Sequence, residues 1–287
     1  MQYRFRYEEN PINPALGFSD GPNDPANRAF YRIREAYVGR LEGETFTPIF
    51  RALQGGEIGF AFREQGAGDF VGGFHGDEVM TFAELIIDGQ KTALNQPRFA
   101  TFTQLTFLQE SIMTRCNTPD EKLVLHKQKY TVFENTVQLF QHIEWLSDAK
   151  PLHAAYAPML TAQRLDPKDP SRVLTDTVEF YDGKGALLTT FDTTPYGPDA
   201  GGKYCDTVCK NTPAWSVKVY GKESGLALEC GFTVVAGSIP IDQLSADLCI
   251  RYGKALDNKI YFEIGGKTAP KAGTVWEKDV YYRLTYQ

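Results

Sequence analysis

Histidine is scarce in this chain of 287 residues, and one of its four histidines lies in a short stretch rich in glycine and charge. The stretch runs from Val71 to Glu78 and packs His75, Asp77 and Glu78 beside three glycines. Glycines let a backbone turn sharply or approach a ligand closely, and loops of this kind often contact substrates. A turn in which Asp77 and His75 bond the local backbone accounts for the same residues. We favour the first interpretation and predict a catalytic or ligand-contacting loop.

A second group of polar residues follows the alternation of a predicted strand over residues 123–133. Side chains alternate along a strand, so His126, Gln128 and Tyr130 share one face. A patch of this kind on the concave side of a sheet suits substrate binding. A solvated outer face with ordinary cross-strand polar pairs is the alternative.

The next predicted strand, over residues 137–146, decides whether that patch is larger. With a three-residue connection at 134–136, His126 lies opposite Glu144, and Gln128 lies opposite His142. With a two-residue turn, His126 lies near Ile143 or Trp145 and the patch dissolves, because a one-residue shift moves every side chain to the other face.

These residue types suit the removal of a proton from a carbon beside a carboxylate. Such chemistry needs a positioned base, often Tyr or His, and a group that stabilises the developing charge. We expect His126 or Tyr130 to take the proton, His75 to stabilise the charge and Glu78 to orient His75. The predicted substrate-binding residues are Asp77, Gln128, His142 and Glu144.

The set of His75, His126 and Tyr130, together with Glu144-Trp-Leu and the aromatic strands, resembles polysaccharide lyases that act on uronic acids on β-sandwich or jelly-roll faces. A weaker resemblance is to aldose-epimerase-type sandwiches, which pair histidines with a glutamate. The resemblance implies a carbohydrate-active enzyme, with a lyase as the first expectation. A non-catalytic carbohydrate-binding or structural sandwich is the main alternative, and a capsid or tail-type jelly roll is a third.

We expect no cofactor. Asp77 and Glu78 are the residues that a Ca²⁺ ion would use together with loop carbonyls, although no regular oxygen-ligand loop is spelled out.

The composition limits the classes of molecule that the protein is expected to bind. The net charge is −6 and is spread along the chain, whereas nucleic-acid binding needs a basic stripe. No apolar run approaches the roughly 20 residues of a membrane-spanning helix. Aromatic residues make up 13% and suit both pleated sheets and surfaces that stack on sugars. We therefore expect a carbohydrate partner, with neither nucleic acid nor a membrane.

The cysteines number five, an odd set without CxxC spacing: Cys116, Cys205, Cys209, Cys230 and Cys249. Residues 1–9 also lack the apolar region of a secretory signal. We predict that at least four thiols are unpaired and that the protein is cytoplasmic. If a cleaved signal precedes this sequence, the protein is secreted, and Cys205 and Cys209 are then positioned to cross-link a loop.

Alternating segments separated by turn residues predict an all-β fold, a large antiparallel β-sandwich or jelly roll with few short helices. We expect one domain over residues 1–287, with residues 1–28 as an extended N-terminal arm. The segment 30–41 fits a strand or a helix, and we favour a strand. Residues 240–249 are the expected short helix. The other expected strands cover 45–53, 57–63, 79–88, 91–94, 100–115, 123–133, 137–146, 173–181, 186–191, 215–220, 226–235, 259–264 and 275–286.

Overall fold

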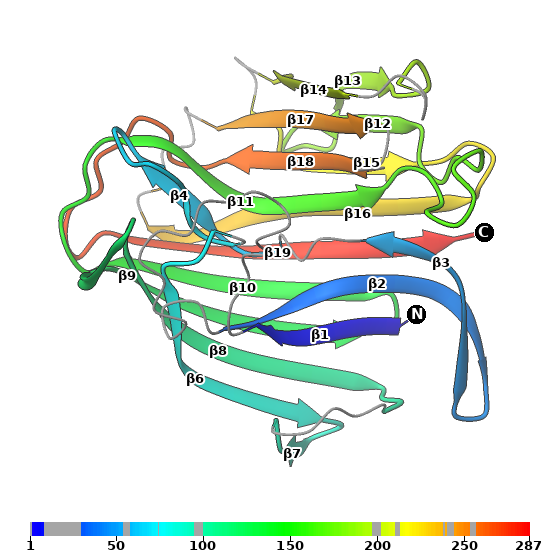
Figure 1. Ribbon diagram of the computed structural model, residues 1–287, viewed down its shortest axis with the longest axis horizontal. Helices are drawn as coiled ribbons and strands as arrows, with labels where there is room; N and C mark the ends of the chain where they lie inside the picture. Colours follow the sequence, from blue (N-terminus) through cyan, green and yellow to red (C-terminus); the bar gives the residue numbers. More distant parts are fainter. Residues whose placement is uncertain are drawn as a thin grey trace.

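The computed structural model describes residues 2–8, 30–53, 58–73, 75–94, 100–196, 202–209, 213–237, 239, 244–252 and 257–287. Every regular element in these ranges is a β-strand. The strands form two antiparallel sheets that pack face to face (Figure 1). The predicted all-β sandwich is confirmed.

Sheet A contains nine strands within the described residues. Its order is β1 (Gln2–Glu8), β2 (Phe30–Glu42), β3 (Thr45–Leu53), β11 (Leu152–Gln163), β18 (Asp257–Glu263), β17 (Ser245–Tyr252) and β14 (Gly202–Thr207). β4 (Ala61–Glu64) also pairs with β11, and β5 (Val71–Gly72) pairs with β4. β11 therefore holds the two parts of the sheet together.

Sheet B contains ten strands, again within the described residues. Its order is β13 (Leu187–Asp192), β12 (Thr177–Tyr181), β15 (Ser216–Tyr220), β16 (Leu226–Gly237), β19 (Val275–Tyr286), β10 (Thr136–Trp145), β9 (Thr118–Phe133), β8 (Gln104–Arg115), β6 (Glu78–Ile87) and β7 (Gln90–Thr92). β8, β9 and β10 are neighbours, so the predicted three-strand meander is confirmed.

A single hydrophobic core lies between the sheets. Buried and less buried residues alternate along β8, β9, β10 and β19, because successive side chains point to opposite faces. Trp145 and Trp276 meet edge to face at 5.4 Å, and Phe62 of sheet A packs against Trp145 at 5.1 Å. These rings bridge the two sheets and fix how they pack.

The turn between β9 and β10 corrects the predicted register. Thr136 pairs with Phe133, so the connection has two residues, and Glu134 adopts φ 49°. His126 therefore lies opposite Ile143. Of the two connections considered, the structure has the two-residue turn, and the register that places His126 opposite Glu144 is wrong.

Other differences arise where local residues misled the prediction. β11 lies between the strands expected at 137–146 and 173–181, and β14 lies between those expected at 186–191 and 215–220. Residues 245–249 belong to strand β17, so the predicted helix over 240–249 is wrong there, while 240–243 lie outside the described residues. Gln2–Glu8 pairs with β2 as a sheet strand, and residues 9–28 of the expected arm lie outside the described residues.

A disulfide between Cys205 and Cys249 overturns the prediction of at least four free thiols. The two residues are direct partners on β14 and β17, with Cα atoms 4.2 Å apart. Opposite positions on paired strands bring side chains within bonding reach. Because 44 residues separate the two cysteines, their spacing gave no signal.

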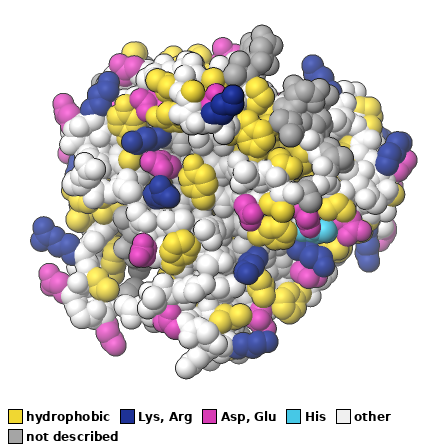
Figure 2. Space-filling view, turned by 180° about the vertical axis from the view of Figure 1, so that it is seen from behind, with side chains coloured by type: hydrophobic (Ala, Val, Ile, Leu, Met, Phe, Trp, Pro, Cys, Tyr) yellow, Lys and Arg dark blue, Asp and Glu magenta, His cyan; other side chains and the backbone are white. Residues whose placement is uncertain are grey.

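Charged side chains of both signs alternate singly over the face seen in Figure 2, without a patch of one sign. Among the described residues, no helix has the length and apolar character needed to cross a membrane.

Candidate functional site

Residues of the glycine-rich stretch and of the strand that carries His126 meet between the sheets. We call Glu78, Ser111, His126 and Gln141 the buried polar cluster. Glu78 Oε1 lies 3.2 Å from His126 Nδ1 and accepts a hydrogen bond of 2.5 Å from Ser111 Oγ. Gln141 Nε2 lies 3.2 Å from His126 Nε2. A carboxylate beside Nδ1 favours the proton on that nitrogen, which leaves Nε2 to accept from the Gln141 amide. All four side chains are buried.

A second buried chain of hydrogen bonds continues along the same face. Gln109 donates to Gln128 Oε1 at 2.8 Å, and Gln128 donates to the Tyr130 hydroxyl at 3.0 Å. The Tyr130 hydroxyl lies 3.5 Å from the carbonyl oxygen of Ile58. Buried polar groups satisfied in this way fix the packing of the two sheets.

The prediction that His75, Glu78, His126 and Tyr130 line one cleft open to solvent is therefore wrong. Glu78, His126 and Tyr130 are at most 2% exposed, because their alternating positions face the other sheet. Only His75 is part of an accessible surface.

His142 and Glu144 also lie apart from Gln128, on the outer face of sheet B. His142 Nδ1 lies 2.7 Å from Glu277 Oε1, and its Nε2 lies 3.6 Å from Glu144 Oε2. The two-residue turn puts these side chains on the opposite face from Gln128, so the predicted substrate-binding patch is divided between two faces.

The conformation of the glycine-rich loop explains why His75 and Glu78 do not lie together. Gly72 N donates to Gly76 O at 2.8 Å, and His75 N donates to Gly72 O at 3.0 Å, which closes a tight turn. Asp77 adopts φ 55°, and its carboxylate accepts from Asn117 N at 2.9 Å. The loop thus leaves His75 partly exposed, whereas Glu78 is the first residue of β6 and is buried.

His75 begins a row of rings over the face of sheet A that points away from the core. The ring centroids are 5.1 Å apart from His75 to Phe70, 5.7 Å from Phe70 to Tyr156, and 5.2 Å from Tyr156 to Tyr261. His75 Nδ1 lies 3.0 Å from Asp69 Oδ1. Burial raises the pKa of Asp69, but the hydrogen bond and charge of His75 outweigh it and hold that pKa below its ordinary value.

Two carboxylates lie at the far end of this row. The Tyr156 hydroxyl donates to Asp247 Oδ2 at 3.0 Å, and Ser245 Oγ donates to Glu263 Oε2 at 3.4 Å. Burial and the charge of Asp247 raise the pKa of Glu263 to about 6. Burial and Asp247 also raise the pKa of Tyr156. We call Phe70, His75, Tyr156, Asp247, Tyr261 and Glu263 the outer-face cluster.

Strand alternation and one irregularity place these groups together. Tyr261 and Glu263 alternate with buried Ile260 and Phe262 on β18, so they share the outer face. On β11, the residues between Tyr156 and Met159 oppose a single residue of β18, which makes a β-bulge. Bulges re-aim side chains, and here the bulge follows directly after Tyr156.

The sequence interpretation missed Tyr156, Asp247, Tyr261 and Glu263. Asp247 lay in the predicted helix over 240–249, and Tyr156 lay between the strands expected at 137–146 and 173–181. The usable signal was the alternation of Tyr261 and Glu263 at the end of a predicted strand. Nothing in the spacing links these three segments, because the sheet order joins them.

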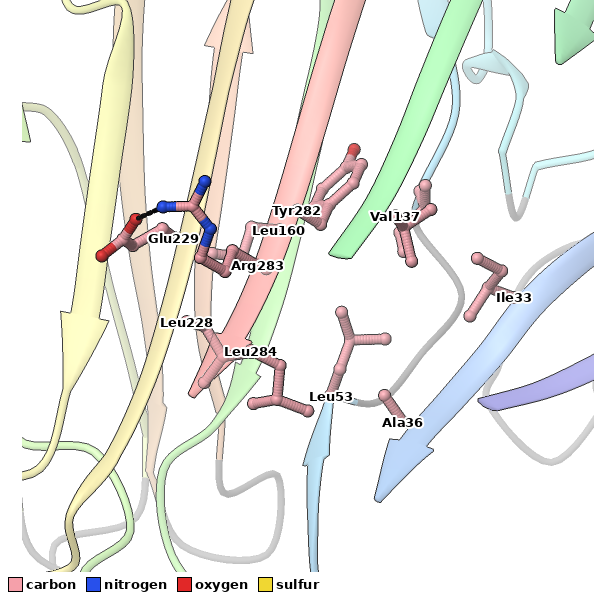
Figure 3. Close-up of a pocket in the computed structure, with 11 residues that line it drawn as sticks. Ile33, Ala36, Leu53, Val137, Leu160, Leu228, Glu229, Tyr282, Arg283 and Leu284 are labelled. Carbon is pink, nitrogen blue, oxygen red and sulfur yellow. Dashed lines mark hydrogen bonds and ion pairs between the residues drawn. The ribbon is translucent and has the colours of Figure 1, made fainter. Parts of the chain in front are cut away.

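The pocket drawn in Figure 3 lies elsewhere, between the sheets. Aliphatic side chains such as Ile33, Leu53 and Leu284 point into it, and Arg283 pairs with Glu229 at one side. No group of three or more His, Cys, Asp and Glu side chains in the described part of the chain is arranged to hold a metal ion.

No family model matches this chain, and no curated protein matches it. Three solved structures are similar to it at a TM-score of 0.39. They are a GH36 α-galactosidase from Geobacillus stearothermophilus (10% identity, 92% of this chain and 36% of that chain), the Slr1438 protein from Synechocystis (11%, 91% and 99%) and a putative aldose 1-epimerase from Escherichia coli (10%, 85% and 92%). This chain thus spans about a third of the galactosidase. Likenesses at this level carry no inference about the chemistry of the site.

Proposed function

We propose that the protein binds a sugar on the outer-face cluster and catalyses a proton-transfer reaction of that sugar. The observation that supports this most directly is a row of accessible aromatic rings ending at two carboxylates, one with a pKa near 6. Aromatic faces stack on the C–H faces of sugar rings, and carboxylates accept hydrogen bonds from sugar hydroxyls. A group with a pKa near the working pH both takes and returns protons efficiently.

Five members of the cluster have a direct role in this proposal. Phe70 and Tyr261 provide the stacking surface, and Tyr156 and Asp247 bind hydroxyl groups. Glu263 in its carboxylate form takes a proton from the sugar. The first candidate reaction is the interconversion of aldose anomers, because it requires proton transfers and no leaving group. Glu263 takes the proton of the anomeric hydroxyl and returns it to the ring oxygen as the ring opens, and the transfers reverse when the ring closes on the other face.

Elimination from a uronic-acid sugar, the reaction expected from the sequence, is the second candidate. It requires a cation that neutralises the substrate carboxylate as charge develops. The charge of Arg63 acts on Asp69, and the charge of Lys267 acts on Glu263. These two cations flank the cluster and are suited to a carboxylate-bearing sugar.

One set of measurements separates the candidates. The protein is titrated calorimetrically with neutral aldoses and with uronic-acid oligosaccharides. Anomer exchange is followed by the optical rotation of freshly dissolved aldose, and elimination by absorbance near 235 nm. We expect binding to a sugar and faster anomer exchange, with a rate that rises as the pH passes about 6 and Glu263 ionises.

The outcomes bear on the proposal in different ways. Binding that is lost in Tyr261→Ala, without turnover of any sugar, would make the protein a binding module. Absence of binding to every neutral and acidic sugar would overturn the proposal.

A further inference from the structure

Two polar side chains of β19 are buried without belonging to the buried polar cluster. Lys278 is 0% exposed and Tyr282 is 5% exposed. Both point from sheet B towards sheet A. A buried amine is costly to desolvate, and a methionine of similar length would fill the space without that cost. A lysine at position 278 therefore calls for an explanation other than packing.

Both side chains reach the same short segment of β11. Lys278 Nζ donates to Ala157 O at 3.5 Å, and the Tyr282 hydroxyl donates to Met159 O at 3.2 Å. These two carbonyl groups lie on either side of Pro158. Lys278 Nζ also lies 5.8 Å from the centroid of the Phe60 ring, which holds the amine from a second direction.

The segment that they contact is the β-bulge of β11. Proline has no N–H to donate, and the pairing with β18 shifts register between Tyr156 and Met159. The strand ladder is therefore interrupted just after Tyr156, the residue whose hydroxyl bonds Asp247. The hydrogen bonds from Lys278 and Tyr282, which reach β11 from inside the sandwich, replace the support that a regular strand ladder would give.

We propose that Lys278 and Tyr282 are positioning residues that hold the β11 bulge from inside the sandwich and so keep the Tyr156 hydroxyl on Asp247. They touch no substrate, because they lie on the opposite side of sheet A from the outer-face cluster. The expected effect on sugar affinity rests on the proposed function, whereas the expected effect on the position of the Tyr156 hydroxyl does not.

The test uses two variants and a matched control. Lys278→Met removes the amine and keeps the length of the side chain. Tyr282→Phe removes only the hydroxyl. Tyr130→Phe is the control, because Tyr130 is also a buried tyrosine of sheet B, and its hydroxyl accepts from Gln128 Nε2 and lies beside Ile58 O.

The main readout is the ionisation of the Tyr156 phenol, followed by NMR of protein labelled with ¹³C-tyrosine and assigned with Tyr156→Phe. Burial and Asp247 raise the pKa of Tyr156 above its ordinary value of 10.0. Loosening of the bulge exposes the phenol and weakens its bond to Asp247, so we expect the pKa to fall towards 10.0 in both variants. It stays unchanged in Tyr130→Phe. A role in stability alone would lower the resistance of the variants to urea without moving this pKa.

Sugar affinity is the second readout. We expect it to fall about five- to tenfold in Tyr282→Phe, since a misplaced contact group weakens binding, and less than about twofold in the control. An unchanged Tyr156 pKa in both variants would overturn the positioning role. A lowered pKa in a protein that binds no sugar would uphold the positioning role and remove the proposed function.

Discussion

The buried polar cluster and the outer-face cluster use the same kinds of residue but differ in access to solvent. Each includes a histidine that lies next to a carboxylate: His126 lies 3.2 Å from Glu78, and His75 lies 3.0 Å from the neighbouring Asp69. The first pair is at most 2% exposed, whereas the side chains of His75 and Asp69 are 27% and 38% exposed. Residue type therefore does not distinguish an enclosed pair from an accessible one in this molecule.

The carboxylates of the two regions are also held differently. Glu78 is bonded to Ser111 and His126 inside the sandwich. Glu263 receives one hydrogen bond, of 3.4 Å, from Ser245 and has a raised pKa. A carboxylate enclosed by partners stabilises the fold, while one that is half-buried beside another negative charge is ready to exchange protons.

Removal of the buried carboxylate should have the largest effect. Glu78→Ala leaves His126 and Ser111 without their shared acceptor, and we expect it to lower the free energy of unfolding by roughly 3–5 kcal/mol. Urea unfolding measures this. Glu144→Ala on the outer face of sheet B is the control and should change stability by less than about 0.5 kcal/mol. Equal losses of unfolding free energy in the two variants would show that the buried and the exposed carboxylate contribute alike to stability.

Removal of Glu263, the proposed proton-transfer group, should have the next largest effect. Glu263→Gln keeps the shape of the side chain, and we expect it to lower the turnover of a bound sugar by about a hundredfold or more. Sugar affinity should change little. Initial rates at saturating sugar give the answer, and a variant that keeps full turnover would assign catalysis elsewhere.

The aromatic row should contribute a smaller amount to sugar binding. Tyr261→Ala removes a stacking surface, and we expect the affinity for the sugar to fall about tenfold, which corresponds to about 1.4 kcal/mol. Calorimetric titration measures it. Phe107→Leu inside the sandwich serves as the comparison and should leave affinity unaffected.

The pH dependence of stability gives the smallest effect. The pKa of Glu263 is raised from 4.5 to about 6 in the folded protein, so the folded state holds a proton that the unfolded chain has already released. The stabilisation associated with that proton is complete below pH 4.5 and is lost as the pH rises through about 6. Allowing for solvent screening, we expect Glu263→Gln to be more stable than the parent by about 1 kcal/mol at pH 8.

Urea unfolding at pH 4.5, 6 and 8 follows this effect, with Glu144→Gln as the control. A parallel pH dependence in the parent and in Glu263→Gln would show that another group is responsible. A variant that is both more stable and inactive would show that the site reduces the stability of the fold.

Most of the sandwich could be predicted from the sequence because alternation and turn residues are local signals. The β8–β9–β10 meander and the strands of sheet B follow from them. β11 could not be recognised, because residues 157–163 are buried on both faces, which removes the alternation, and because Pro158 lies within the strand. The β9–β10 register depended on a single residue in the turn, since Glu134 adopts the left-handed conformation that glycine usually takes.

The candidate site was less predictable than the fold, for a physical reason. Tyr156, Asp247 and Glu263 come from three strands that meet through sheet order, and sheet order depends on the whole chain. His75 was found because its glycines mark a tight turn. His126 and Tyr130 share a face as expected, but that face was expected to be open to solvent, because a sequence shows which side chains share a face and not whether that face is covered.

The disulfide between Cys205 and Cys249 has a consequence for handling the protein. It fastens β14, the last described strand at that margin of sheet A, to its neighbour β17. A detached margin strand leaves the hydrogen-bonding groups of the next strand open to pairing with other chains. Material made in a reducing compartment should therefore self-associate more readily than oxidised material, and oxidative refolding is the preparation to choose.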